Sequence, residues 1–312
     1  MASIGQVYKG KLRKDGMEVA VKVQRPKVLE NVALDLYVLR SIIAPFNTDF
    51  VALIDAWGSG FVDELDYRAE AKATKDFTKA MKERGLDSVV FAPEVMDELS
   101  STHVLVTKWV DGERLSTSNE DDVPRLCGIA LNTYLTMLLD TGTLHCDPHP
   151  GNLLRTPEGK LCILDWGMVL DVPKDLQLSL LEFIADLKAE NYEDVPMDLV
   201  KLKFVPEDKL DELRQSGLTE MAEDSMSRSD STTSTTVDVT TKIEQMRQQN
   251  TNVFSIPDYF VYMSRAFATL EGIGLSSNSN YSILKECYPY ISKRLLTDDS
   301  PRARQALRML IY

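Results

Sequence analysis

The chain has 312 residues, 44% of them hydrophobic, and a formal net charge of −13. This length and composition can bury a core in one or two domains. The acidic balance argues against nucleic acid as a partner and against purely electrostatic binding to anionic lipid. The four cysteines form no CxxC pair and have no metal-site spacing, so we expect free or buried thiols in a reducing compartment. No segment has the pattern of a signal peptide or of a membrane span.

The first residues predict a β-hairpin over residues 2–24. Residues 19–23 (VAVKV) alternate as a strand does and carry Lys22, and residues 14–16 (KDG) offer the turn before them. A segment with a single glycine, residues 2–8 (ASIGQVY), opens the hairpin. Because Met1 precedes this segment directly, we expect the chain to be incomplete at its amino end, with any targeting peptide upstream.

Two helices and two strands are expected next. Residues 27–43 place Leu29, Val32, Leu36 and Leu39 on one helical face. A charged helix over 61–84 begins near Asp63. Strands follow at 91–95 and 103–109, and residues 109–112 (WVDG) mark the passage to a second, mostly helical domain.

Residues 126–144 are mostly apolar but are interrupted by polar residues. Because the apolar residues repeat at helical spacing, this segment predicts a buried helix. The motif HCDPHPGN follows at residues 145–152, and DWG follows at 165–167. Asp147 therefore precedes Asn152 by five positions, and Asp165 comes thirteen positions later. This is the spacing of a kinase catalytic loop and its metal-binding turn. Asp147 can orient a hydroxyl, Asn152 and Asp165 offer hard oxygen ligands to Mg²⁺, and Gly167 permits a sharp turn.

The upstream segments complete this pattern, since residues 2–8 take the place of a nucleotide loop and Lys22 that of the phosphate-binding lysine. We predict an α+β class with a bilobal protein-kinase-like fold. A small β-rich lobe over 1–110, truncated at its start, precedes a large helical lobe over 111–312. Within the second lobe, residues 225–242 are rich in Ser and Thr and predict a disordered insert.

The departures from ordinary kinases point to a subtype. The segments ASIGQV, ELDYRAE (64–70) and HCDPHPGN resemble the UbiB/ADCK family of atypical kinases. The stretches 254–274 and 295–310 are similar to that family through less specific motifs, and residues 295–310 most resemble its plastid branch.

The resemblance implies a set of site residues. Glu70 matches the position that pairs with the lysine, and a buried lysine needs such a carboxylate. Glu64 and Asp66 match the ExD motif of the family, with helix-initiating acids as the alternative. The expected nucleotide contacts are Ala2, Ser3, Ile4, Gly5, Val7, Ala20, Lys22, Glu64, Asp66, Trp109 and Val110. The expected catalytic residues are Asp147, Lys22 and Glu70, and the expected metal ligands are Asn152 and Asp165.

Four departures bear on activity. Ala2 replaces a glycine, which stiffens the loop, and Cys146 stands where an arginine would dock an activation loop. His149 replaces the basic residue of the catalytic loop. Only residues 168–173 separate Gly167 from the next helix, so a platform for peptide substrates is missing.

Three functions stay open on the sequence. The first is an Mg·ATP-dependent kinase or ATPase of isoprenoid quinone or prenyl-lipid metabolism, which the resemblance places in plastoglobules of the chloroplast ahead of the mitochondrion. Apolar helices at 256–270 and 281–296 would then border a lipid or quinone-like substrate at a membrane surface, or would merely complete the core. The second is an ATP-binding pseudokinase-like module, and the third is a true protein kinase.

Overall fold

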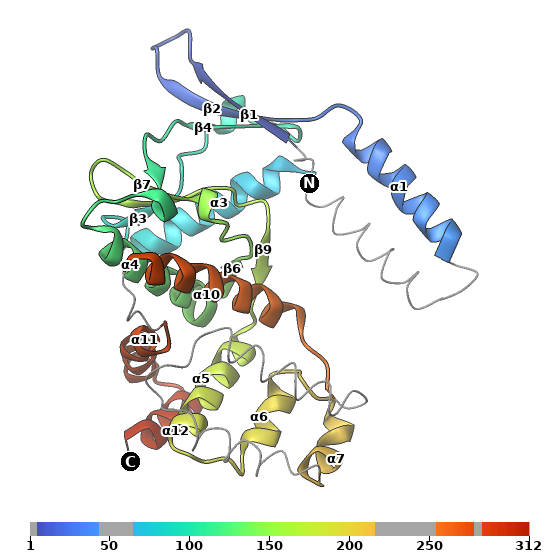
Figure 1. Cartoon of the computed structure of the whole chain (residues 1–312), viewed down its shortest axis with the longest axis vertical. Helices are drawn as coiled ribbons and strands as arrows, with labels where there is room; N and C mark the ends of the chain where they lie inside the picture. Colours follow the sequence, from blue (N-terminus) through green and yellow to red (C-terminus); the bar gives the residue numbers. More distant parts are fainter. Residues whose placement is uncertain (1–4, 44–64, 216–253, 278–282, 312) are drawn as a thin grey trace. The chain divides into compact units, whose positions relative to one another are not determined.

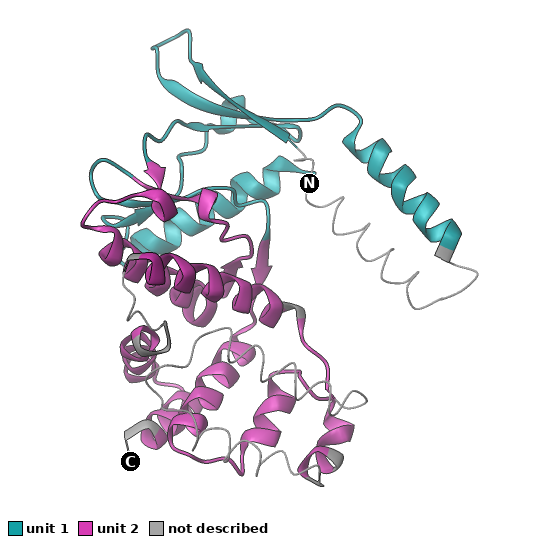
Figure 2. Ribbon diagram, viewed as in Figure 1, with its two compact units in different colours: residues 1–112, 156–168 teal, residues 113–155, 169–312 magenta. Residues whose placement is uncertain are grey.

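The computed structural model describes residues 5–43, 65–215, 254–277 and 283–311 (Figure 1). The chain divides into two compact units (Figure 2). Unit 1 comprises residues 1–112 and 156–168, and unit 2 comprises residues 113–155 and 169–312. The change at residue 112 lies close to the expected domain boundary, whereas residues 156–168, expected in the second domain, group with unit 1.

Over its described residues, unit 1 combines three antiparallel strands, two long helices and a short parallel strand pair. Its strands are β1 (Gly5–Lys11), β2 (Glu18–Gln24), β3 (Val90–Phe91), β4 (Val104–Lys108) and β8 (Leu161–Ile163). Its helices are α1 (Val28–Ile43), α3 (Tyr67–Glu83) and the 3-10 turn η1 (Asp97–Leu99). The order in the three-stranded sheet is β1-β2-β4, and β3 pairs with β8.

The predicted hairpin is confirmed over its described residues. β1 and β2 pair antiparallel in a register that sets Lys22 opposite Val7, and β2 sets Lys22 opposite Leu105 of β4. Gly16 adopts the left-handed conformation that the tight connection requires (φ +75°). The central position of β2 therefore fixes the backbone of Lys22 from both sides.

Two predicted boundaries were wrong. The charged helix begins at Tyr67 and not near Asp63, because the Asp66 carboxylate accepts the Arg68 amide and caps the helix. Asp63 itself lies outside the described residues. The strand expected over 91–95 continues only from Val90 to Phe91, since Pro93 lacks an amide hydrogen for a ladder. Further along the expected strand, Val95 pairs with Thr107 through an isolated β-bridge. The strand expected over 103–109 is confirmed as β4.

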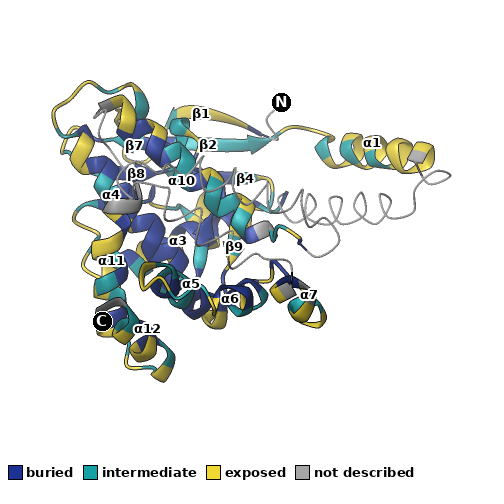
Figure 3. Ribbon diagram, turned by 60° about the horizontal axis from the view of Figure 1, so that its bottom comes forward, coloured by how far each residue is buried: buried dark blue, intermediate teal, exposed yellow. Residues whose placement is uncertain are grey.

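Helix α1 is confirmed over 28–43, but its apolar face is not buried against the described residues of unit 1. Leu29 and Leu39 are 49% and 38% exposed, while Val32 and Leu36 are half-buried. Figure 3 shows the helix mostly in the colours of exposed and intermediate residues. The amphipathic spacing thus predicted the helix correctly, but it did not predict which residues pack on its apolar face.

Unit 2 is mainly helical. Its α-helices are α4 (Val123–Thr136), α5 (Lys174–Lys188), α6 (Val195–Lys201), α7 (Leu210–Gln215), α10 (Asp258–Ser277), α11 (Ile283–Thr297) and α12 (Pro301–Ile311). Its tighter or wider turns are η2 (Leu115–Thr117), the π-helical η3 (Met137–Thr141), η4 (Pro150–Asn152) and η5 (Glu207–Lys209). Its strands are β5 (Glu113–Arg114), β6 (Thr143–His145), β7 (Leu153–Arg155) and β9 (Val169–Asp171).

The apolar run before the catalytic motif forms the predicted buried helix. Leu126, Leu131 and Tyr134 of α4 and Leu139 of η3 are 0–1% exposed. The helix ends at Gly142, whose left-handed backbone (φ +74°) turns the chain into β6. Burial of this helix therefore anchors the strand that carries His145, directly before the predicted catalytic loop.

The segment after the DWG motif is short, as predicted. β9 pairs antiparallel with β6, Pro173 follows, and α5 begins at Lys174. Proline is well suited to the start of a helix because it has no amide hydrogen to satisfy. The chain therefore passes from Met168 to α5 without a long activation segment.

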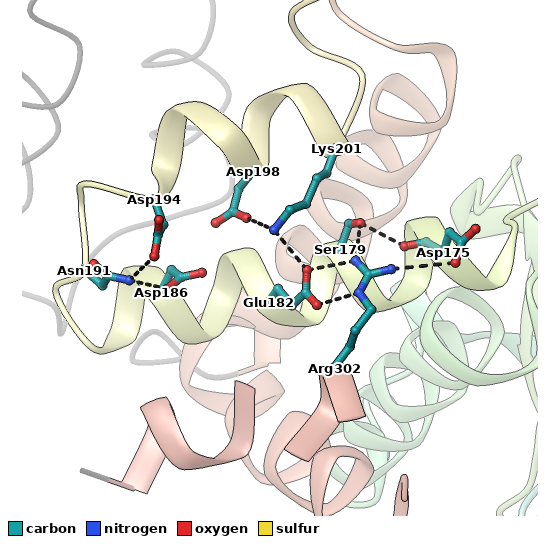
Figure 4. A network of polar contacts seen from close by, with 9 residues as sticks. All are labelled: Asp175, Ser179, Glu182, Asp186, Asn191, Asp194, Asp198, Lys201 and Arg302. Atoms are coloured by element: carbon teal, nitrogen blue, oxygen red, sulfur yellow. Dashed lines mark hydrogen bonds and ion pairs between the residues drawn. The ribbon is translucent and has the colours of Figure 1, made fainter. Parts of the chain in front are cut away.

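A polar network holds α5, α6 and α12 together (Figure 4). The Glu182 carboxylate accepts from Arg302 (Nε to Oε1, 2.6 Å) and from Lys201 (3.2 Å). Lys201 also pairs with Asp198, which is 0% exposed and has one oxygen, Oδ2, without a partner among the described residues. Burial raises the pKa of Asp198 to about 7, opposed by Lys201 and reinforced by Asp186. This network fixes the C-terminal helix on the core of unit 2.

The carboxyl-terminal helices complete the core of unit 2, which is the plainer of their two expected roles. Buried residues occur on both: Tyr259, Ala266, Leu270 and Ile273 on α10, and Cys287, Ile291 and Leu295 on α11. Their exposed large apolar side chains, among the described residues, are Val261, Leu275, Tyr288 and Leu296. Along the part of the chain that the structure describes, we find no helix long and apolar enough to cross a bilayer. The Ser/Thr-rich segment 225–242 lies outside the described residues.

Candidate nucleotide and phosphoryl-transfer site

Lys22, Glu70 and Asp165 meet in unit 1. The Lys22 ammonium contacts both Glu70 carboxylate oxygens at 2.8 and 2.9 Å and Asp165 Oδ1 at 2.8 Å. The three residues come from β2, from the first turn of α3 and from the turn after β8. The structure thus brings together three side chains that sequence analysis assigned separately to phosphate binding, lysine pairing and metal binding.

The charges of this triad are strongly coupled. Lys22 and Glu70 have side chains only 20% and 6% exposed, whereas the Asp165 side chain is 47% exposed. Burial alone would lower the pKa of Lys22, but the two carboxylates outweigh it and raise the pKa, so the lysine stays charged. Burial raises the pKa of Glu70 to about 7, with the Lys22 charge opposing and the Asp165 charge adding to the rise. Glu70 is therefore the member of the triad that can gain a proton near neutral pH.

Tyr67 is a site residue that sequence analysis missed. Its ring lies 5.2 Å from the Lys22 ammonium, in cation–π range, and the residue is 2% exposed. Among the described residues its hydroxyl has no hydrogen-bond partner, and it lies where a side chain on Gly5 would begin. Gly5 is thus needed for close approach, not for backbone freedom. The available signal was the spacing of Tyr67 and Glu70 on one helical face.

The DWG turn is fixed by its tryptophan. Trp166 is 2% exposed, its ring centroid lies 4.2 Å from that of Phe77 on α3, and its indole donates to the Ile163 carbonyl at 3.0 Å. Asp165 takes the left-handed conformation (φ +56°), which is uncommon outside glycine and often marks functional sites.

Gly167 lies in the turn, as predicted, but the left-handed backbone conformation belongs to Asp165 and not to Gly167. A side chain on Gly167 would instead contact the Glu70 carboxylate at 3.4 Å.

Asp147 and Asn152 meet in unit 2. The Asn152 side-chain amide donates to the Asp147 carbonyl at 3.0 Å and to its carboxylate at 3.4 Å. The turn between them is closed by the Gly151 amide, which donates to His149 Nδ1, and by the Asn152 amide, which donates to the His149 carbonyl. Because the Asn152 nitrogen is used as a donor, its side-chain oxygen is the atom that can ligate a cation.

Arg265 of α10 also reaches this loop, which the sequence did not predict. Its guanidinium lies 3.4 Å from Asp147 Oδ1. Behind the loop, the Tyr134 hydroxyl and His145 Nδ1 are 3.3 Å apart, and both residues are 0% exposed. Burial raises the pKa of the Cys146 thiol to about 12, so the residue that replaces the expected arginine is neutral. The loop is consequently supported by a buried polar pair, and Arg265 lies beside its aspartate.

The expected adenine contacts, Trp109 and Val110, follow β4. The Trp109 amide donates to the Glu18 carbonyl at 3.0 Å, and its indole nitrogen donates to Asp111. With the Trp109 amide engaged, Val110 is the stronger candidate for an adenine contact.

The remaining candidates are less informative. Ala2, Ser3, Ile4 and Glu64 lie outside the described residues. Val7 is 61% exposed on β1, and Ala20 lies on β2 opposite Thr107 of β4. The Asp66 carboxylate caps α3 and pairs with Arg68 at 2.7 Å, and the hydrogen bond from Arg68 lowers its pKa. This geometry fits the alternative role of a helix-initiating acid.

Comparison with known proteins decides the family. A model described as the ABC1 atypical kinase-like domain matches residues 1–198. The chain belongs to this family. The chloroplastic aarF domain-containing protein kinase At1g71810 of Arabidopsis thaliana is 35% identical over the whole of this chain and 44% of its own length. The chloroplastic protein ACTIVITY OF BC1 COMPLEX KINASE 3 of the same plant is 34% identical over the whole of this chain and 45% of its own length.

A solved structure supports the fold. The Rv3197–erythromycin complex from Mycobacterium tuberculosis matches with a TM-score of 0.58 and 22% identity, over 87% of this chain and 70% of that chain. The predicted α+β kinase-like fold and the predicted family, with its chloroplastic relatives, are thereby confirmed. The chain spans about half the length of the curated relatives it matches. The roles of individual site residues stay predictions.

Proposed function

We propose that this ABC1-family chain binds Mg·ATP and transfers its γ-phosphoryl group to a small-molecule or lipid hydroxyl, or to water. The observation that carries the proposal is the contact of Lys22 with both Glu70 and Asp165. A lysine held by a buried glutamate is positioned to bind the phosphates, and an adjacent aspartate is positioned to bind their metal. The alternative of a mere structural ion pair does not account for Asp165, which is half-exposed and left-handed.

Residues of the chain fit a magnesium ion. Asp165 supplies a half-exposed carboxylate, and Asn152 supplies an amide oxygen oriented by the two hydrogen bonds of its nitrogen. Hard oxygen donors of this kind suit Mg²⁺, which keeps most of its remaining ligands as water and phosphate. When bound, the ion would neutralise phosphate charge, while Lys22 would hold the nucleotide and Asp147 would orient the attacking hydroxyl.

The acceptor that we propose is not a peptide. Residues 168–173 lead directly from the DWG turn into α5, so the segment on which peptide substrates lie in ordinary protein kinases is absent from this stretch. Membership of the ABC1 family and the chloroplastic names of the relatives support an isoprenoid quinone or prenyl-lipid acceptor in the plastid, with plastoglobules as the proposed site. Helices α10 and α11 each use one face to complete the core of unit 2, so they add no separate argument for a lipid surface.

A second candidate is a regulatory module that uses ATP as a conformational ligand. Two observations favour it: Cys146 replaces the arginine of the catalytic loop, and Ala2 replaces a glycine of the nucleotide loop. Both candidates need nucleotide binding, and only the first needs turnover. A true protein kinase would need a peptide platform elsewhere.

Thermal stabilisation tests nucleotide binding. Mg·ATP at about 100 times its Kd stabilises a protein by about 2.7 kcal/mol. Lys22→Met should remove most of this shift. Lys72→Met is the matched control, since Lys72 lies on the exposed side of α3 and pairs with its neighbour Asp76. An equal shift in all three proteins would contradict the proposed phosphate site.

Turnover then separates the candidates. We expect a phenolic quinone precursor in detergent, or liposomes, to raise ATP hydrolysis. Asp147→Asn should remove the increase and keep ATP binding, because Asp147 orients the acceptor and does not hold the nucleotide. Binding without any turnover would favour the regulatory module. Phosphorylation of generic peptides as fast as ATP is consumed, with lipid having no effect, would favour the protein kinase.

A further inference from the structure

Arg265 is presented to the catalytic loop by a firmly packed helix. Its neighbour Ala266 is 0% exposed, and Leu270, one turn further on, is 1% exposed, so α10 is anchored in unit 2, where it packs against α4. The Arg265 side chain itself is 59% exposed and places one guanidinium nitrogen 3.4 Å from Asp147 Oδ1. An exposed ion pair of this kind contributes little to stability. Its position beside the predicted acceptor-orienting carboxylate calls for another explanation.

The catalytic loop lacks a positive charge of its own. Cys146 is neutral, and His149 stands where the loop of ordinary kinases has a basic residue. His149 Nδ1 accepts a hydrogen bond from the Gly151 amide at 3.0 Å, so that nitrogen is engaged within the loop. Phosphoryl transfer spreads negative charge over the oxygens of the moving group, and a cation near the acceptor stabilises that charge.

The geometry points to Arg265 as the residue that supplies this cation, binding the phosphoryl group while it passes to the acceptor. This inference rests on the proposed function. A guanidinium has five donors in a planar fork, so a contact with Asp147 leaves others for phosphate oxygens. Asp147 would then hold Arg265 in place as well as orient the acceptor.

The balanced step is an ordinary phosphoryl transfer. The acceptor oxygen forms a bond to the γ-phosphorus, and the bond from that phosphorus to the bridging oxygen of ADP breaks. ADP leaves with the electron pair, and the acceptor proton passes to Asp147. Arg265 forms and breaks no covalent bond. It contacts the oxygens whose charge increases, which is the role of an arginine donated from outside the catalytic loop.

The test compares Arg265→Gln and Arg265→Lys with Arg304→Gln. Arg304 is the matched control because it also forms an exposed pair with an aspartate, Asp299, at 2.8 Å on a C-terminal helix. We expect kcat for ATP turnover to fall by about 100-fold or more in Arg265→Gln, with KM for ATP and the melting temperature little changed. Arg265→Lys should recover part of the loss, and Arg304→Gln should lose nothing. Loss of melting temperature with unchanged kcat would show a purely structural pair and overturn the inference.

A binding measurement separates this inference from the proposed function. Aluminium fluoride with Mg·ADP mimics the phosphoryl group in transfer, so its addition should tighten ADP binding in the wild type and not in Arg265→Gln. If the wild type binds no Mg·ADP, the proposed function is wrong and this inference falls with it. If Mg·ADP binds, equal tightening in both proteins, or none in the wild type, overturns the role of Arg265 and leaves nucleotide binding intact.

Discussion

Protonation of Glu70 should control nucleotide affinity near neutral pH. Its pKa is raised to about 7, first by burial and then by the nearby charge of Asp165, against the opposing charge of Lys22. A magnesium ion that binds Asp165 would cancel one of the two causes of the rise. The bound state therefore favours ionised Glu70, so binding releases a proton and the affinity for Mg·ADP falls as the pH drops through 7.

The size of the effect follows from the ionised fraction. With a pKa of about 7, Glu70 is about nine-tenths ionised at pH 8 and about one-tenth ionised at pH 6. If the ionised form is the one that binds, the Kd for Mg·ADP should rise about tenfold between these pH values, which corresponds to about 1.4 kcal/mol. Glu70→Gln cannot ionise and should lose this component of the pH dependence.

Isothermal titration calorimetry at several pH values, in buffers of different ionisation enthalpy, measures both Kd and the protons released. The phosphates of ADP titrate in the same range, so the informative quantity is the difference between wild type and Glu70→Gln, in which that contribution cancels. Glu83→Gln on the same helix is the control, because Glu83 is exposed and makes a long, 3.9 Å pair with Lys79. Identical pH profiles for wild type and Glu70→Gln would refute the assignment of Glu70 as the titrating group.

Three further changes test the metal, the buried acid and the turn before the catalytic strand. Asp165→Asn should abolish the Mg²⁺-dependent part of the stabilisation by ATP, and an unchanged melting shift would rule out Asp165 as a ligand. Burial raises the pKa of Asp198 to about 7, so its carboxyl keeps a proton in the folded state that the unfolded chain releases, and the wild type should lose unfolding free energy as the pH rises from 4 to 7. Urea titrations of Asp198→Asn should show a flatter profile, and parallel profiles would contradict the shift. Gly142→Ala should cost at least about 1–2 kcal/mol in thermal unfolding, because φ is +74° and the new carbon would lie 2.7 Å from the Val172 carbonyl. Gly128→Ala, a helical position with nothing within 4 Å, should not destabilise the chain, and equal losses would show that the backbone argument is wrong.

Short sequence motifs were sufficient to predict most of the polar residues of the candidate site. Lys22, Asp147, Asn152 and Asp165 lie in local patterns whose spacing is set by one strand or one turn, so a linear sequence displays them. Glu70 could not be predicted from a local motif alone. It was selected because a buried lysine requires a carboxylate partner and because the family resemblance places one at this position.

Tyr67 and Arg265 escaped prediction for a different reason. Their roles depend on packing between elements remote in sequence, and neither residue lies in a motif with its partner. Arg265 is more than 100 positions from Asp147, and only the seating of α10 in unit 2 brings them together. The start of this helix was predicted near Asp63 because acidic residues are favourable at several positions around a helix N-terminus. The start is set by Asp66, which caps the helix.

Helix α3 explains why the charged triad of unit 1 can be rigid although one of its members lies on a turn. One face of this helix carries Tyr67, Glu70 and Phe77. Tyr67 and Glu70 contact Lys22, and Phe77 contacts the ring of Trp166. The Trp166 contact holds the turn that carries Asp165, so a single helix positions a strand residue and a turn residue at once. A displacement of α3 would separate Glu70 from Lys22 and loosen the DWG turn together, because both depend on the same buried face. Nucleotide affinity and metal binding should therefore respond jointly to substitutions at Phe77, which touches neither ligand.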